Sequence, residues 1–185
     1  MKSRSDFEEI GLPHGHVYPK LAYHPPTGSI IVQTQLAEST LPSRRLSIRR
    51  LNEARYHPIG DFPPEISTES FVLCASSPLL FVNTFIWKEH INGPVGGDWD
   101  ALYSFNLDTL QSDILVRKDE LVPPDGYRSA WFSTLFSASN DGRKLFCRAG
   151  LRNQEPKKPI DYCLSEFSVA DRKLAIITKL KAVFA

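Results

Sequence analysis

The chain has 185 residues and a formal net charge of +1, with 22 Lys and Arg against 21 Asp and Glu. This length suits one domain with a sizeable core, and the near-zero net charge excludes a global field that would select nucleic acid, anionic membranes or acidic substrates. No apolar run reaches the roughly 20 residues of a transmembrane helix. Three cysteines without a Cys-x-x-Cys pair and an N-terminus without an apolar stretch predict reduced, packed thiols in a cytoplasmic protein.

The pattern of apolar residues predicts strands and almost no helix. After an N-terminal arm at residues 1–16, the spacing of apolar residues has a period of two. The long polar or proline-rich connections divide the single β domain (17–185) into three units. We place these units at 17–64, 67–124 and 127–185.

Each unit is expected to contain four consecutive strands. In chain order the expected strands are 20–23, 29–35, 44–51 and 55–59, then 71–75, 80–87, 101–107 and 112–117, then 131–138, 144–149, 161–168 and 173–180. The turns after the first and third strand of each unit are short and rich in Pro, Gly, Asn and Asp, as tight turns require. A four-stranded antiparallel sheet repeated along the chain is typical of the blades of a β-propeller.

Several stretches resemble the WD-like repeats of TolB-type propellers. Phe136-Ser-Ala-Ser-Asn-Asp-Gly-Arg-Lys-Leu-Phe146 is similar to the family's F-S-x-D-G-x-x-L stretch, and Ala22-Tyr-His-Pro-Pro-Thr-Gly-Ser-Ile-Ile-Val32 is a looser version of it. Residues 102–115 are similar to the family's hairpin between third and fourth strands, although unit two lacks the Asp-Gly turn. The resemblance implies a fold and no particular activity.

Three blades are too few to close a ring, since propellers close with about four to eight. We therefore expect an open half-propeller whose end faces carry the apolar rows Ile30/Val32 and Leu174/Ile176. A homodimer of six blades would cover these faces, with the apolar end 182–185 in or beside the contact; another protein could complete the ring instead. The rival interpretation of the same strands is one twisted β-sandwich or barrel, which needs no partner.

The long connections should lie on one edge of the sheets, where binding residues concentrate on a rigid scaffold. The richest of them, at 88–100, is read as a mobile loop that holds carboxylates, a histidine, a tryptophan and three glycines. Its candidate binding residues are Lys88, Glu89, His90, Asp98, Trp99 and Asp100. Trp99 is the expected contact anchor.

Two other sequence features suggest ligands, but each favours a structural role. His14 and His16 form a His-x-His pair, yet no third metal ligand is evident nearby. Residues 44–50 hold four arginines, which could contact phosphates. Alternation instead sends Leu46 and Ile48 inward and predicts a solvated strand face for the arginines.

The sequence thus favours a non-enzymatic protein-interaction module with no metal or cofactor, because no nucleophile elbow, phosphate loop or zinc spacing occurs in it. Two alternatives stay open. One is a metal-dependent hydrolase that uses Glu89, His90, Asp98 and Asp100. The other is nucleic-acid or phospholigand binding through 44–50, which the charge balance does not favour.

Overall fold

The computed structural model describes residues 16–36, 44–90 and 93–180, and for 16–19, 36, 88–90 and 93–96 it describes the backbone alone. The predicted arm therefore lies outside the described residues, except that the first strand begins at His16, and so does the predicted interface segment 182–185. Within the part of the chain that is described, no helix is long and apolar enough to cross a membrane.

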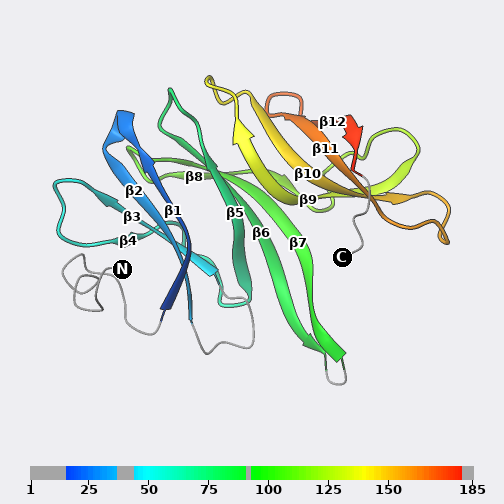
Figure 1. The fold of residues 1–185 in the computed structure, drawn as a ribbon, viewed down its shortest axis with the longest axis horizontal. Helices are drawn as coiled ribbons and strands as arrows, with labels where there is room; N and C mark the ends of the chain where they lie inside the picture. Colours follow the sequence, from blue (N-terminus) through cyan, green and yellow to red (C-terminus); the bar gives the residue numbers. More distant parts are fainter. Residues whose placement is uncertain (1–15, 37–43, 91–92, 181–185) are drawn as a thin grey trace.

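Three antiparallel sheets of four strands make up the fold (Figure 1). The first sheet consists of β1 (His16–His24), β2 (Ser29–Leu36), β3 (Arg44–Arg50) and β4 (His57–Pro58). The second consists of β5 (Ile66–Leu73), β6 (Leu79–His90), β7 (Gly93–Asn106) and β8 (Ser112–Arg117). The third consists of β9 (Tyr127–Ala138), β10 (Lys144–Asn153), β11 (Asp161–Ser168) and β12 (Lys173–Lys179).

The predicted all-β class and the three four-stranded units are confirmed. Each sheet pairs its strands in chain order, and none of the three is closed into a barrel. In Figure 1 the sheets stand side by side, with the first and third at the two ends. The short turns are built from the residues that tight turns favour: a single 3₁₀ turn, η1 (Pro25–Thr27), precedes Gly28, and Gly28 and Gly142 have φ values of 62° and 70°.

One apolar core lies between the first and second sheets. Alternate residues of β2 and β3, among them Ile31, Leu46 and Ile48, face Phe71 and Phe105 of the second sheet, and all five are almost fully buried. The predicted inward orientation of Leu46 and Ile48 is therefore confirmed. Burial of such side chains is worth about 1.5–3 kcal/mol each, which makes this face a main source of cohesion between the sheets.

A second, larger core lies between the second and third sheets. It includes Phe81, Leu102 and Phe132, together with the three cysteines (Cys74, Cys147 and Cys163). All three thiols are free and buried, as the sequence predicts. Burial raises the pKa of the Cys147 thiol to about 12, so this cysteine is a small apolar core residue and a poor nucleophile.

The apolar row predicted at Leu174 and Ile176 for an open end face is wrong. Leu174 is only 6% exposed, and both residues pack into the core toward the second sheet. The register explains the difference, because Leu174 pairs with Phe167 and Ile176 pairs with Ser165, on the inward side of β11. Alternation predicts that these residues share a face but not which neighbour that face meets. In the first sheet Ile30 is half-buried and Val32 is buried, so the predicted exposed row is also wrong at Val32.

Candidate functional site: a cleft between the second and third sheets

The segment 88–100, predicted as a loop, is mostly a β-hairpin. Strand β6 continues to His90 and β7 begins at Gly93, with Trp87 opposite Gly97 in the ladder. A glycine at position 97 leaves room for the indole of Trp87, because a Cβ there would lie 3.0 Å from its ring atoms. Gly97, one of the three glycines that suggested a loop, thus makes space for an aromatic ring within the sheet.

The structure disperses the six predicted binding residues. Lys88, Glu89 and His90 lie in β6, and their side chains are outside the described part. The exposed Asp98 forms an ion pair with Lys118 at 3.1 Å. Asp100 accepts a hydrogen bond from the Thr84 hydroxyl at 3.0 Å.

Trp99 is not a surface anchor. Its side chain is 3% exposed, its indole N–H donates to Asn83 Oδ1 at 2.8 Å, and its ring meets Phe132 edge-on at 5.2 Å. A buried indole of this kind stabilises the packing of two sheets. A bulge in the β6–β7 ladder places Trp99 opposite Phe85, and both face the third sheet.

Asp98 and Trp99 nevertheless line a cleft with a volume of about 850 Å³. The cleft lies between the β6–β7 hairpin, the start of β9 and the β10–β11 connection, on the edge that carries the long connections. Its aromatic lining comes from both sheets: Phe85, Trp99, Trp131 and Tyr162. Its charged lining contains both signs: Asp98, Lys118, Asp119 and Arg152.

The aromatic side chains of the third sheet are held in place by the backbone beneath them. Trp131 lies across Gly150, where a Cβ would come within 2.2 Å of the indole. Tyr162 meets Trp131 edge-on, with ring centroids 6.4 Å apart, and the Arg148 guanidinium lies 4.2 Å from the Tyr162 ring. Sequence reasoning missed Trp131 and Tyr162, because nothing local marks Gly150 as the place where an indole packs.

A small polar cluster fastens β9, β11 and β12 beside this cleft. Asp161 accepts hydrogen bonds from the Tyr127 hydroxyl at 2.8 Å and from Lys179 Nζ at 2.9 Å. The hydrogen bond from Lys179, which is the larger cause, and the hydrogen bond from Tyr127 hold the pKa of the Asp161 carboxyl below its ordinary value. A carboxyl with a lowered folded-state pKa stabilises the fold above its unfolded-state pKa, and that contribution is lost as pH falls through the folded-state value.

We expect Asp161→Asn to lower the free energy of unfolding at pH 7 by about 0.5–1 kcal/mol, because the group is partly exposed and solvent screens it. The difference from the wild type should shrink below about pH 4, the ordinary range for an aspartate. Urea unfolding followed by tryptophan fluorescence at pH 7 and pH 3 measures both values. An equal loss in the free energy of unfolding at both pH values would show that the charge of the Asp161 carboxylate does not contribute to stability.

The arginines of residues 44–50 bind the protein itself, which corrects the prediction of a solvated face. Arg44 pairs with Glu69 at 2.6 Å, and Arg50 donates to the Asp108 carbonyl at 3.0 Å. Arg45 donates to the carbonyls of Ile66, Pro63 and Pro64. Arg49 donates to the Glu53 carbonyl at 3.3 Å. Each of the four guanidinium groups thus has at least one acceptor within the protein.

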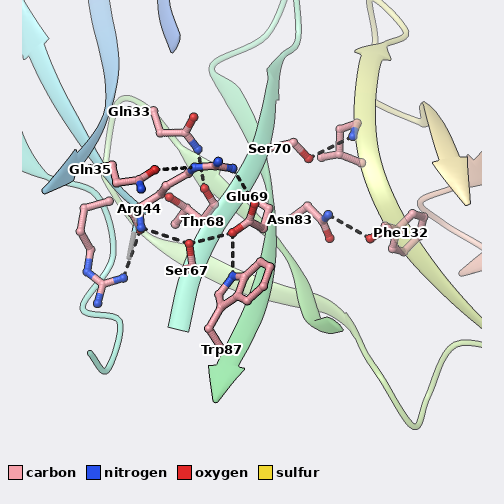
Figure 2. Close-up of polar contacts among 12 residues, drawn as sticks. Gln33, Gln35, Arg44, Ser67, Thr68, Glu69, Ser70, Asn83, Trp87 and Phe132 are labelled. Atoms are coloured by element: carbon pink, nitrogen blue, oxygen red, sulfur yellow. Dashed lines mark hydrogen bonds and ion pairs between the residues drawn. The ribbon is translucent and has the colours of Figure 1, made fainter. Parts of the chain in front are cut away.

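Glu69 is the centre of a polar network between the first and second sheets (Figure 2). Its carboxylate accepts hydrogen bonds from Arg44, from the Ser67 hydroxyl at 2.9 Å and from the Trp87 indole N–H at 2.8 Å. Ser67 in turn accepts from the Arg44 backbone N–H at 3.1 Å. Three donors on three strands therefore share a single, largely buried carboxylate.

The histidines and carboxylates of the described residues form no group of three that could hold a metal ion. His24 is buried, and its ring forms hydrogen bonds with Thr27 Oγ1 at 2.8 Å and with the Cys74 carbonyl at 2.9 Å. His14 lies outside the described residues, and only the backbone of His16 is described. The metal and acid–base interpretation of Glu89 and His90 stays a prediction, because the structure describes only the backbone of these two residues.

No protein-family model matches the chain, and no curated protein matches it in sequence.

Proposed function

We propose that the chain is a non-enzymatic binding module that holds a protein partner in the cleft between its second and third sheets. The observation that carries the proposal is the cleft's lining, which combines four aromatic rings with charges of both signs on the long-connection edge. Its volume of about 850 Å³ falls in the range of ligand-binding clefts.

The chemistry of the lining favours a peptide segment of a protein as the ligand. Aromatic side chains and arginine are enriched in protein interfaces, where they supply most of the binding energy. Trp131 and Tyr162 offer partly exposed rings, and Arg152 and Asp119 are exposed charges able to orient polar groups of a partner. The walls are strands of two packed sheets, so little conformational entropy is lost when the partner binds.

Selection from a library of displayed random peptides tests this function. We expect peptides that bind the protein with a Kd below about 100 µM, and we expect Ile160→Asp and Arg152→Glu to weaken that binding at least tenfold, roughly 1.4 kcal/mol. Both side chains line the cleft and are exposed, so the variants should still fold.

Leu51→Asp is the matched control, because Leu51 is 61% exposed at the opposite, short-turn edge. It should leave peptide binding unchanged. Failure to select any peptide, or selection of peptides that bind the cleft variants and the wild type equally, would contradict the proposal.

We also propose that the three sheets are half of a TolB-type propeller and that a second copy of the chain completes the ring with six blades. The support is the face-to-face packing of three sheets of the same topology, which leaves one face of the first sheet and one face of the third without a neighbouring sheet among the described residues. A reducing compartment such as the cytoplasm fits the three free, buried thiols.

A further inference from the structure

The same kind of hydrogen bond joins the first sheet to the second and the second to the third. In each case a side-chain amide of one sheet donates to a backbone carbonyl of the next. Gln33 Nε2 donates to the carbonyl of Thr68, and Asn83 Nδ2 donates to the carbonyl of Phe132 at 3.1 Å (Figure 2). The two acceptors are equivalent, since each lies at a β-bulge in the first strand of its sheet. A bulge leaves the local ladder incomplete and turns such a carbonyl outward.

A second pair of equivalent positions also joins neighbouring sheets, although the side chain donates in one case and accepts in the other. Lys20, paired with Gln33 in the first sheet, donates through Nζ to the Phe71 carbonyl of the second sheet. Ser70, paired with Asn83 in the second sheet, accepts through Oγ from the backbone N–H of Leu135 in the third, at 3.0 Å. Phe71 and Leu135 are themselves equivalent, since each lies three positions after the bulge carbonyl in its strand.

The third sheet carries the same set of positions on its unpacked face. Arg148 pairs with Thr134 as Asn83 pairs with Ser70, and it makes no hydrogen bond with the described residues. Beside Arg148 in the ladder lies Leu164, the counterpart of Leu46 and Leu102. Those two leucines are 1% and 0% exposed against the next sheet, whereas Leu164 is half-buried.

The first sheet carries the complementary set on its own outer face. Strand β1 has an irregularity between Val17 and Lys20, at the register of the bulges in β5 and β9. Leu21 follows it and is the counterpart of Phe71 and Leu135. These two are 0% and 3% exposed, whereas Leu21 is 62% exposed.

We propose that the outer face of the third sheet docks on the outer face of the first sheet of a second copy, with Arg148 donating to the backbone carbonyl at the β1 irregularity. The inference rests on the proposed completion of the ring by a second copy, and it adds the two faces and their contacts. A second copy is the occupant because the outer face of its first sheet carries the irregularity in β1 and Leu21. These stand where the second and third sheets carry the bulge and the apolar residue that contact the preceding sheet. In a two-fold dimer the same junction forms twice, which closes the assembly.

Solution mass by light scattering, with the full chain, tests the docking. The wild type should measure about 42 kDa, twice the chain mass of 20.9 kDa. Leu164→Asp, Arg148→Glu and Leu21→Asp should each raise the dimer dissociation constant at least about tenfold, as loss of a central contact does. Leu51→Asp, an equally exposed leucine of the first sheet, should leave the mass unchanged. Circular dichroism checks that each variant keeps its strands.

Mixing two variants gives the decisive result. Leu164→Asp chains keep an intact first-sheet face and Leu21→Asp chains keep an intact third-sheet face, so the mixture should regain one junction and associate more tightly than either variant alone. A dimer that survives both variants would overturn the docking while leaving completion by a second copy intact. Sensitivity to Leu164→Asp alone would overturn it in favour of third-sheet faces pairing with each other. A wild-type protein that is monomeric at about 100 µM would overturn both the docking of these faces and the completion of the ring by a second copy. Peptide binding at the cleft is measured separately.

Discussion

Replacing Phe132 by alanine should lower the free energy of unfolding by about 3–5 kcal/mol, the usual cost of removing a buried aromatic ring. Phe132 is 0% exposed and meets two rings edge-on, Trp99 at 5.2 Å and Phe167 at 5.1 Å. Its removal would open a cavity in the core that joins the second and third sheets. Urea unfolding followed by far-ultraviolet circular dichroism measures the loss.

Phe136→Ala is the matched control in the same strand. Phe136 is 53% exposed, so its truncation should cost less than about 1 kcal/mol. Comparable losses for the two phenylalanines would contradict the placement of the core on one face of β9.

Replacing Glu69 by alanine should lower the free energy of unfolding by about 2–4 kcal/mol, because it leaves partly buried charges and donors without a partner. The Glu69 side chain is 14% exposed, and Arg44 and the Trp87 indole both donate to its carboxylate. Loss of the carboxylate should also change the fluorescence of Trp87. Urea unfolding with fluorescence detection reports both effects.

Glu166→Ala is the control for the Glu69 variant. Glu166 pairs with Lys144 at 2.9 Å, but the Lys144 side chain is 53% exposed and the Glu166 side chain 29%. An exposed pair of this kind contributes at most about 1 kcal/mol. If the two glutamate variants lost equal stability, the network around Glu69 would be no stronger than an ordinary surface ion pair.

The division into three four-stranded sheets could be predicted from the sequence because it depends on local patterns. Period-two alternation predicts strands, and the Pro, Gly, Asn and Asp clusters predict their turns. The expected range 112–117 for β8 agrees with the structure at both ends, and 161–168 does so for β11. Strand β4 is shorter than expected, at His57–Pro58, because proline cannot donate to a ladder and restricts strands to sheet edges.

The candidate site could be predicted only in part, because long-range contacts create it. Asp98 does lie in the cleft, but the sequence does not show that Trp99, beside it, points into the core. Glycine is a loop signal locally, yet Gly97 and Gly150 are sites where a distant tryptophan covers the backbone. The face on which Leu174 packs follows from the neighbouring sheet, which no local pattern describes.

Most of the polar contacts between the sheets end on main-chain carbonyls rather than on side chains, as the bonds from Lys20, Gln33 and Asn83 show. A carbonyl is present at every residue, so a mutation in the accepting strand does not remove the acceptor. Repeated units joined in this way tolerate sequence differences without paired, compensating substitutions. Amide and ammonium donors become interchangeable at these positions, so units as dissimilar in sequence as the first and second can stack on their neighbours in the same way.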